Sequence, residues 1–374
     1  MRKFIPVAAP ALIGNEKKYV LDCIKSNWIS SNGKYIQNFE ESFADFNKVK
    51  YALSCSNGTV ALHLALMALG ISTGDEVILP TFTYVATANA VMYCGAKPIF
   101  IDSDSETWNI DPSLIEKFIT KNTKAIIVVH IYGHPVDMDV VMNIAQKHHL
   151  FVIEDAAEAH GAEYKGQIVG SFGDISIFSF YGNKVITTGE GGMVITNNDL
   201  LASKVRQLKG QGMDPSRRYW FPILGYNYRM TNIAAAIGLA QLENINWHIS
   251  RRREIATRYQ ENFKDFPEIQ LQPEKPYARS IHWLSSITIS EIIPISRDQI
   301  MKELEILGIE TRPFFYPLHL LPIYQNQNIG RDFPVAEKIA ARGINLPSSA
   351  NLTSAEIDFV CSGIIKLLMN VSSK

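Results

Sequence analysis

The chain has 374 residues, of which 47% are hydrophobic and 20% are charged, and its formal net charge is −1. A chain of this length exceeds the usual size of one hydrophobic core, so we expect two domains. The near-neutral charge argues against a nucleic-acid-binding surface. No run of about 18 apolar residues predicts a membrane span, and the first residues lack the apolar stretch of a signal peptide, so we expect a cytoplasmic protein.

Between residue 50 and about residue 200, short apolar runs alternate with amphipathic segments. We expect buried strands at 51–54, 76–79, 98–101, 125–129, 151–153, 175–179 and 192–196. Helices are expected at 59–69, 84–93, 112–119 and 138–148. Strand, helix and strand in this rhythm predict right-handed crossovers and a mostly parallel sheet covered on both faces.

The second half of the chain predicts a smaller domain of mixed secondary structure. A helical pattern runs from 233 to 260, and three arginines at 251–253 are expected to face solvent. A strand is expected at 282–290, and helices at 297–307, 334–342 and 353–370. These elements predict an α+β domain over residues 246–374, after a large domain over residues 1–245.

The loops that follow the strands are the expected place for chemistry, because ligands of an open parallel sheet lie at the carboxyl ends of its strands. Ser56-Asn57-Gly58-Thr59 follows one strand and opens a helix. Its glycine allows a ligand close to the backbone, and the first N–H groups of a helix favour a phosphate. The alternative is a plain N-terminal cap. The chain has no Walker A loop and no complete dinucleotide-binding glycine pattern.

Two further strands end in charged residues. Asp155 closes an apolar strand, where a partly desolvated carboxylate normally needs a cation such as a protonated pyridine nitrogen; capping of the next turn is the alternative. Lys184 lies just beyond another strand, among aromatic residues and before a glycine-rich turn. A desolvated lysine readily changes its pKa and can form a Schiff base with an aldehyde cofactor. The two residues and the phosphate loop in one sheet favour such a cofactor site.

Several patterns that resemble metal sites are better explained otherwise. Four cysteines are scattered without CxxC spacing, which is typical of reduced thiols. His130 and His134 are four residues apart, but the glycine and proline beside them argue against a helix that presents both to zinc. Asp102 and Asp104 resemble the DxD metal site of glycosyltransferases, but a helix entry follows them. We expect no metal site.

Six motifs, in this order and spacing, resemble the sugar aminotransferases of the DegT/DnrJ/EryC1/StrS family over essentially the full length. They lie at 56–59 with 61–66, 74–78 with 80–84, 130–135, 154–162, 179–192 and 225–231. The resemblance implies an α/β protein of the type I aspartate-aminotransferase fold, with a mostly parallel seven-stranded sheet and a smaller C-terminal α+β domain. It implies pyridoxal 5′-phosphate as cofactor, glutamate as amino donor and a nucleotide-linked keto-sugar as acceptor.

The resemblance also implies roles for individual residues. Lys184 is the expected Schiff-base lysine, and Asp155 is the expected partner of the pyridinium nitrogen. Tyr84 is expected to stack on the ring and Glu158 to lie near its hydroxyl, while Asn227 reaches the phosphate in a second subunit, which implies a homodimer with sites at its interface. The remaining implied cofactor contacts are Ser56, Asn57, Gly58, Thr59 and Ser179. Lysine rather than histidine at position 184 disfavours the dehydratase branch of the family.

The segments 180–192 and 217–222 look most like family members that aminate carbon 4 of GDP-4-keto-6-deoxymannose to make GDP-perosamine, a sugar used in O-antigens of lipopolysaccharide. Arginine matches phosphate oxygens bidentately, so Arg217, Arg218 and Tyr219 are expected at the pyrophosphate and base, unless this stretch is a solvated loop. Phe314 and His319 are further candidates for sugar contacts. The alternatives are a UDP-linked hexose or an octulosonate as substrate and, more remotely, a metal-dependent glycosyltransferase or a cofactor-binding regulatory protein.

Overall fold

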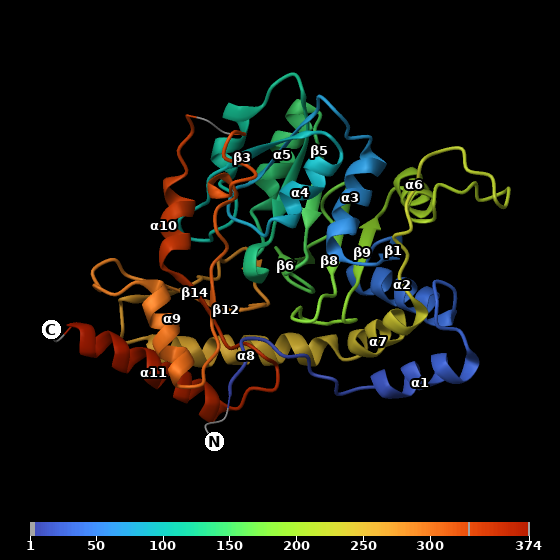
Figure 1. Ribbon diagram of the computed structural model, residues 1–374. Helices are drawn as coiled ribbons and strands as arrows, with labels where there is room; N and C mark the ends of the chain where they lie inside the picture. Colours follow the sequence, from blue (N-terminus) through green and yellow to red (C-terminus); the bar gives the residue numbers. More distant parts are fainter. Residues whose placement is uncertain (1–3, 328–329, 373–374) are drawn as a thin grey trace.

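The computed structural model describes residues 4–327 and 330–372, and a seven-stranded sheet lies at its centre (Figure 1). The strand order is β1-β9-β8-β5-β4-β2-β3; β9 is antiparallel to both of its neighbours, and the other pairs are parallel. The strands are β1 (Tyr51–Cys55), β2 (Glu76–Pro80), β3 (Lys97–Ile101), β4 (Thr123–Val129), β5 (Phe151–Asp155), β8 (Ile175–Ser179) and β9 (Gly192–Thr196). The predicted mostly parallel seven-stranded sheet is confirmed, with strand ends shifted by at most two residues.

Helix α3 (Gly58–Leu69) is the central helix on this sheet. Its sequence is apolar on nearly every side, which is typical of a buried helix, and it contacts β8, β9 and the helices α4 and α6. It begins directly after β1, so its first N–H groups lie at the carboxyl edge of the sheet. The helices of this part are α4 (Ala86–Tyr93), α5 (Met138–His148) and α6 (Asp199–Lys209), with 3-10 turns η1 (Pro112–Phe118) and η2 (Ile131–Gly133).

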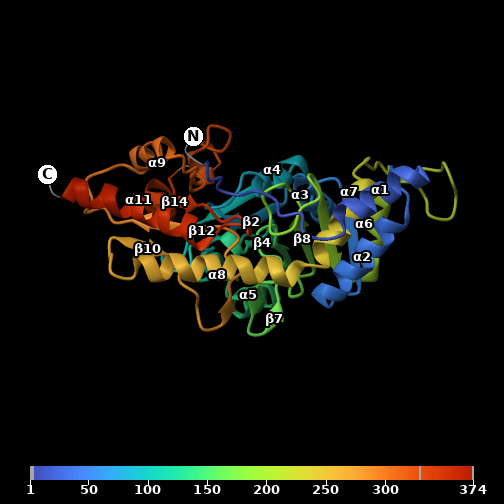
Figure 2. The same ribbon diagram turned by 90° about the horizontal axis from the view of Figure 1, so that it is seen from below.

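Three helices form a group at one end of the molecule (Figure 2). They are α1 (Glu16–Ser26), α2 (Lys34–Asn47) and α7 (Asn232–Leu242), and α7 contacts both others. No element was predicted before residue 50, so α1 and α2 are additions to the predicted fold. α2 also contacts β1, which attaches the group to the edge of the large sheet.

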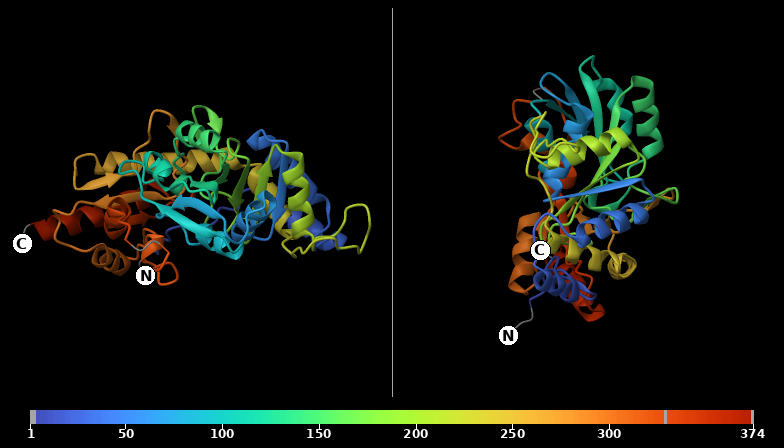
Figure 3. Two further views of the ribbon diagram at one scale, coloured as in Figure 1. Left: turned by 90° about the horizontal axis from the view of Figure 1, so that it is seen from above. Right: turned by 90° about the vertical axis from the view of Figure 1, so that its right-hand side faces the viewer.

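A second hydrophobic core lies at the other end of the molecule (Figure 3). Its four-stranded sheet has the order β10 (Ile269–Leu271), β12 (Ser285–Ile289), β14 (Gly343–Leu346) and β13 (Arg312–Pro313). The helices of this half are α8 (Ile245–Phe263), α9 (Arg297–Ile306), α10 (Pro334–Arg342) and α11 (Ser354–Ser372), with the 3-10 turn η3 (Leu318–Leu320). The domain boundary near residue 245 stays a prediction, because Trp283 and Phe314 pack into the first core instead. Short strands β6 (Glu163–Tyr164), β7 (Gln167–Ile168) and β11 (Ala278–Arg279) form a third sheet.

Three predictions about helices are corrected by the structure. The helix predicted over 233–260 is two helices, because Asn244 departs from helical geometry with φ −113° and ψ 16°. Its Nδ2 donates to the Ala240 carbonyl at 3.1 Å, a side-chain bond that competes with helical hydrogen bonds. The segment 112–119 is a 3-10 helix. Arg252, in the stretch predicted to face solvent, is only 3% exposed.

Within residues 4–327 and 330–372, no helix is long and apolar enough to cross a membrane. The same ranges contain no group of three or more histidine, cysteine, aspartate or glutamate side chains that could hold a metal ion. All four cysteines are free thiols.

Candidate active site

The carboxyl edge of the large sheet brings five predicted residues together. Lys184 follows β8 and Glu158 follows β5, and Lys184 Nζ lies 3.6 Å from Glu158 Oε1. Asp155 is the last residue of β5 and is near enough to affect the charge of the same amine. A Cβ added to Gly58 would lie 2.8 Å from Cβ of Ser179, so the start of α3 touches the end of β8.

Lys184 is held where little water reaches its amine. Its side chain is 12% exposed, and burial lowers the pKa of the amine, against the opposing effect of Glu158 and Asp155. A turn fixes its backbone, since the Lys184 N–H donates to the Tyr181 carbonyl at 2.9 Å. The neutral amine is the nucleophilic form, so burial here favours attack on a carbonyl carbon.

Asp155 is a buried carboxylate with few partners. It is 5% exposed; Oδ2 accepts a hydrogen bond from Thr87 Oγ1 at 2.8 Å, and Oδ1 accepts one from the Ala157 N–H at 3.2 Å. Burial raises the pKa of Asp155, and these two hydrogen bonds do not cancel that rise. Lys184 lowers the pKa of Asp155 from a distance, but no cationic side chain in residues 4–327 and 330–372 forms an ion pair with this carboxylate. A protonated pyridine nitrogen would supply such a partner.

Glu154, its neighbour in the chain, is equally buried but fully satisfied. His130 Nδ1 accepts the Val136 N–H, so the ring proton is on Nε2, which donates to Glu154 Oε2 at 3.1 Å. The other donors to the carboxylate are the N–H groups of Gly170, Phe172 and Gly173 and the hydroxyl of Ser176. Burial alone would raise the pKa of Glu154, but these bonds outweigh it and the pKa is lowered. Glu154 therefore fastens the loop before β8 to β5.

The N-terminus of α3 fits an anion. Asn57 Oδ1 accepts the Val60 N–H at 3.0 Å, so the predicted capping alternative is confirmed for the asparagine side chain. The cap leaves the N–H groups of Gly58 and Thr59 without an acceptor anywhere in the described part of the chain. Capping and anion binding therefore coexist, because they use different N–H groups.

Two other contacts shape the anion-binding loop at the start of α3. The N–H of Ser56 donates to the Tyr228 carbonyl at 2.9 Å, so the backbone of Ser56 is already occupied within the chain. A Cβ added to Gly192 would lie 2.4 Å from the Asn57 carbonyl oxygen, so only glycine lets β9 approach the loop this closely.

Tyr84, at the far side of the sheet edge, is 56% exposed, and its ring centroid lies 5.7 Å from that of Phe315.

Glu158 is the second acid beside the lysine. Its Oε2 accepts the Tyr132 N–H at 2.8 Å. Burial raises the pKa of Glu158 to about 7, although Lys184 acts in the opposite direction. Near neutral pH this carboxyl group therefore exchanges a proton readily, directly beside the amine.

Three residues at the site were not predicted from the sequence. Thr87 binds Asp155, the Trp283 ring centroid lies 3.9 Å from Lys184 Nζ, and Arg252 Nη2 donates to the Lys184 carbonyl at 3.3 Å. Trp283 and Arg252 follow no strand of the large sheet, so the rule that points to strand ends does not find them. The spacing of Thr87, one helical turn after Tyr84, was the one local signal available.

The predicted nucleotide contacts are not gathered with Lys184 within one chain. Arg217, Arg218 and Tyr219 are exposed on the segment between α6 and α7, which stretches away from the body of the molecule (Figure 1). The guanidinium of Arg217 lies 4.2 Å from the Trp220 ring centroid, and that of Arg218 lies 4.9 Å from the ring of Tyr219. Asn227 is also exposed.

The two sugar candidates near the second half are occupied by contacts within the protein. Phe314 is 1% exposed and packs against Phe82, Trp108 and Tyr132, so it is a core residue and is not open to a sugar. His319 has a 10% exposed side chain, and its ring nitrogens lie 2.7 Å from Thr81 Oγ1 and 3.1 Å from Glu337 Oε1. Neither residue presents an unused polar group to a ligand.

The aspartates of the DxD pattern serve the backbone. Asp102 accepts the N–H groups of Val335 and Ala336 and so caps the start of α10. Asp104 accepts the N–H groups of Glu106 and Thr107 in a tight turn. Both carboxylates thus accept hydrogen bonds from the backbone and have a structural role.

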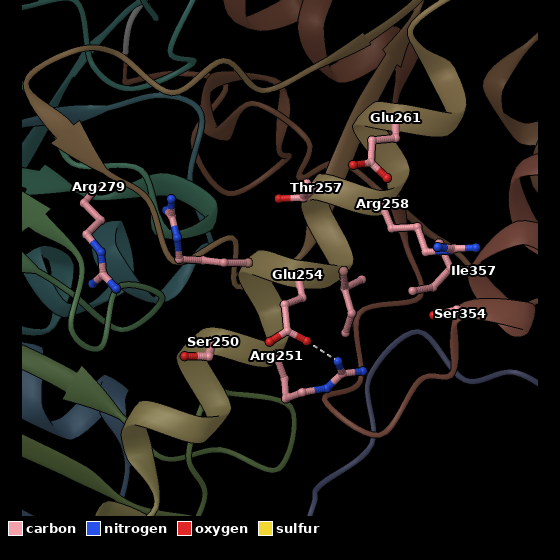
Figure 4. A pocket seen from close by; sticks show the side chains of 11 residues that line it. Ser250, Arg251, Glu254, Thr257, Arg258, Glu261, Arg279, Ser354 and Ile357 are labelled. Carbon is pink, nitrogen blue, oxygen red and sulfur yellow. Dashed lines mark hydrogen bonds and ion pairs between the residues drawn. The ribbon is translucent and has the colours of Figure 1, made fainter.

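A groove beside α8 is lined by four arginines (Figure 4). Each guanidinium is already paired: Arg251 with Glu254, Arg253 with Glu274, Arg258 with Asp358 and Arg279 with Glu163. The groove has no counterpart of the buried amine and acids, so we place the chemistry at the sheet edge.

A desolvated lysine, a buried acid that lacks a cation and an anion cradle, all on this sheet, are what enzymes of the type I aspartate-aminotransferase fold use to hold pyridoxal phosphate. The chain belongs to the DegT/DnrJ/EryC1/StrS aminotransferase family, whose model matches residues 10–365.

Individual relatives agree with this assignment. The chain is 53% identical over 365 residues to GDP-perosamine synthase of Escherichia coli O157:H7 and 50% identical over 366 residues to that of Caulobacter vibrioides, with 97% and 98% of this chain and 98% of each relative covered. The solved structure of PseC, a Helicobacter pylori aminotransferase involved in the biosynthesis of pseudoaminic acid, superposes with a TM-score of 0.93 at 30% identity, covering 98% of this chain and 100% of that one.

Proposed function

We propose that this protein uses pyridoxal 5′-phosphate to move an amino group from glutamate to carbon 4 of GDP-4-keto-6-deoxymannose, making GDP-perosamine. The observation that carries the proposal is the buried Lys184 amine beside Glu158 and Asp155 at the edge of the sheet. The names of the two relatives that share about half of the sequence support the choice of sugar. A cytoplasmic location is part of the proposal.

The residues present fit the cofactor. When bound, pyridoxal phosphate supplies an aldehyde for a Schiff base and a ring that accepts electrons. Lys184 would provide the amine for that Schiff base, and Asp155 would keep the proton on the ring nitrogen. The N–H groups of Gly58 and Thr59 and the hydroxyl of Ser179 would bind the phosphate, while the exposed ring of Tyr84 is free to stack on the pyridine.

Lys184 and Glu158 would handle protons. Each half of an amino transfer takes a proton from one carbon and returns it to another, which requires a base that also acts as an acid. The Lys184 amine has that property, and Glu158, with a pKa of about 7, can take a proton from the amine and return it across 3.6 Å. Burial of both groups keeps these exchanges away from bulk water.

We further propose a homodimer in which the segment between α6 and α7 of one copy reaches the site of the second copy. This segment exposes large apolar side chains, with Trp220, Phe221 and Leu224 exposed by 50%, 52% and 84%. Exposed apolar side chains clustered in this way are typical of a protein–protein contact. Asn227 lies in the same segment, and its Oδ1 accepts a hydrogen bond from Arg229 Nε at 3.0 Å.

The test follows the two half-reactions separately. Glutamate alone should bleach the visible absorbance of the bound cofactor and release 2-oxoglutarate. GDP-4-keto-6-deoxymannose should then restore the absorbance and yield an amino sugar of the mass of GDP-perosamine. Lys184→Ala is the matched control and should show neither change.

Other outcomes would correct particular parts of the proposal. Restoration by a UDP-linked keto-hexose or by a keto-octulosonate, but not by the GDP sugar, would reject the sugar and keep the reaction. A protein that binds no pyridoxal phosphate after reconstitution would reject the reaction itself. Light scattering in solution would reject the homodimer if the mass were that of one chain, 41.9 kDa.

A further inference from the structure

Trp283 presents the face of its indole ring to the amine of Lys184. The ring centroid lies 3.9 Å from Lys184 Nζ, well within the about 6 Å over which a cation and an aromatic face attract each other. Trp283 is 3% exposed, and the short distance leaves no room for a water molecule between the ring and the amine. The same nitrogen lies 3.6 Å from Glu158 Oε1. The amine is therefore in contact with an aromatic face and a carboxylate at once.

Hydrogen bonds fix the position of Trp283 relative to the lysine. Its Nε1–H donates to the Asn183 carbonyl at 2.8 Å, which ties the ring to the residue just before Lys184. Its backbone N–H donates to the Tyr132 carbonyl at 2.9 Å, beside the N–H of Tyr132 that binds Glu158. The ring is thus attached to the backbone on both sides of the site.

Arg252 forms hydrogen bonds with the backbones of both Trp283 and Lys184. Nη1 donates to the carbonyl oxygens of Trp283 and Ser348 at 2.5 and 3.1 Å, and Nη2 donates to the Lys184 carbonyl at 3.3 Å. A buried guanidinium that binds both backbones makes the lysine and the tryptophan one unit, although they are far apart in the sequence. This explains why an arginine predicted to face solvent is buried here.

We infer that Trp283 is a positioning residue that holds the Lys184 amine, together with Glu158, whenever this amine is not bound to the cofactor. The inference rests on the proposed role of Lys184 in the Schiff base. In that role the amine is set free during each half-reaction and must then carry protons, and a flexible four-carbon stem would otherwise let it move away. The negative ring face also favours the ammonium form over the neutral amine.

The test changes the charge of the ring face without changing its shape. Tryptophan analogues with increasing fluorine content are incorporated at position 283 of the full-length chain; fluorine withdraws charge from the face and keeps the indole N–H that binds Asn183. The cofactor is removed, and acylation of Lys184 is followed against pH by peptide mass spectrometry. We expect the pKa of Lys184 to fall stepwise, by about 0.5 to 1.5 units in total, since the ring stabilises the ammonium form.

Trp108 provides the matched control. It is also buried, at 1% exposure, and its ring packs on Phe314 with a centroid distance of 5.1 Å. The same analogues at position 108 should leave the pKa of Lys184 unchanged. Simple variants give a second measurement: Trp283→Phe keeps an aromatic face and should lower the pKa less than Trp283→Leu does.

A constant pKa of Lys184 across the series at position 283, or equal shifts from the series at position 108, would overturn the inference. Because the labelling uses no cofactor and no sugar, a wrong assignment of the sugar would leave its result standing. Amino transfer by Lys184→Ala, in contrast, would reject the proposed role of the lysine, and with it the reason for holding the amine.

Discussion

The carboxyl edge of the large sheet and the segment between α6 and α7 place their charges in opposite environments. At the sheet edge, Lys184, Asp155 and Glu158 are buried, and strand ends and hydrogen bonds fix each of them. On the segment, Arg217 and Arg218 are exposed, and their guanidinium groups lie over aromatic rings of the same segment. Buried charges interact strongly, whereas exposed ones are screened by water and salt. The difference indicates that one chain assembles the buried charges at the sheet edge; that the exposed segment recognises the substrate, with a ligand or a second copy, is part of the proposal above.

The same contrast exists on a smaller scale between Glu154 and Asp155. Both carboxylates are buried at the end of β5, but hydrogen bonds lower the pKa of Glu154, whereas burial raises that of Asp155. A fully bonded carboxylate stabilises the fold, and one that lacks a cation is ready to bind one. We therefore expect substitution of Glu154 to affect mainly stability and substitution of Asp155 to affect mainly turnover.

Lys184→Ala should have the largest effect. We expect amino transfer to fall by about 10⁴-fold or more, because the nucleophile and the proton carrier are lost together. Stability of the fold should change little, since a partly desolvated amine is removed. The measurement is turnover with glutamate and keto-sugar, beside Lys302→Ala, an exposed lysine on α9. Equal losses in the two variants would contradict a special role for the sheet edge.

Asp155→Asn should reduce turnover by about 10²- to 10³-fold, because the proposed cation on the cofactor ring would lose its partner. The free energy of unfolding of the cofactor-free protein should stay the same or rise at neutral pH, since a charge without a cation is removed. Urea unfolding and turnover of the reconstituted protein measure the two effects. Thr87→Val, which removes the hydrogen bond to Asp155 and the longer one with Thr83 but keeps the carboxylate, should cost much less activity. A fall in stability with normal turnover would show that Asp155 stabilises the fold and does not take part in the chemistry.

Glu154→Gln should do the opposite of Asp155→Asn. The new amide group faces backbone N–H donors, so we expect a loss of about 1–3 kcal/mol in the free energy of unfolding. Turnover of the molecules that remain folded should stay within a few fold of the original. A large loss of turnover at unchanged stability would show that Glu154 takes part in the chemistry and would break the contrast between the neighbours.

Much of the division between the two regions could be predicted from the sequence, because it follows from local pattern. The apolar runs predicted where the strands lie. Because the carboxyl ends of parallel strands meet at one edge of a sheet, the same runs predicted that Lys184 and Asp155 lie at that edge. The cap at Asn57 was also readable, because capping depends on residues three positions apart. Contacts between segments that are distant in the sequence could not be predicted. No local pattern shows that Trp283 would lie over Lys184 or that Arg252 would be buried behind both.

Phe314 shows the same limit from the other side. A phenylalanine near a predicted domain edge can face a ligand or the core with equal local support, and only packing against Phe82 and Tyr132 decides. The break between α7 and α8 likewise follows from a single side-chain bond of Asn244, which periodicity does not reveal. Sequence patterns therefore predict elements and strand-end chemistry better than they predict which side chains meet.

Glu158 gives the contrast a pH dependence. Its pKa in the folded, cofactor-free protein is raised to about 7 from an ordinary 4.5, so the folded state holds the proton more tightly than the unfolded state. The stability it contributes is full below pH 4.5 and is lost as the pH rises through about 7. Glu158→Gln should remove this contribution to the pH dependence of urea stability between pH 5 and pH 8. The contributions of Asp155 and of the histidines whose pKa is lowered by burial should remain in both proteins; these histidines include His134, His160, His248 and His282. An unchanged slope would contradict a buried carboxyl group here.

Arg217→Ala should have the smallest effect, and it tests the exposed segment between α6 and α7. We expect KM for the nucleotide sugar to rise about tenfold with kcat nearly unchanged, because the proposed contact of Arg217 with a phosphate would be lost before the chemistry begins. Stability should change by no more than about 0.5 kcal/mol at this exposed position. Arg206→Ala is the matched control, since Arg206 on α6 also lies over a ring, that of Tyr51, at 5.1 Å.

Mixing two inactive or weakened chains then decides which site this arginine serves. In a mixed dimer of Arg217→Ala and Lys184→Ala chains, a segment that serves the second copy leaves one site with both Lys184 and Arg217 intact. Such dimers should turn over at the original KM, although neither parent does. If the segment served its own chain, no site would be complete and the raised KM would remain. Recovery of the original KM would therefore establish that recognition is shared between copies, whereas the chemistry at the sheet edge belongs to one chain.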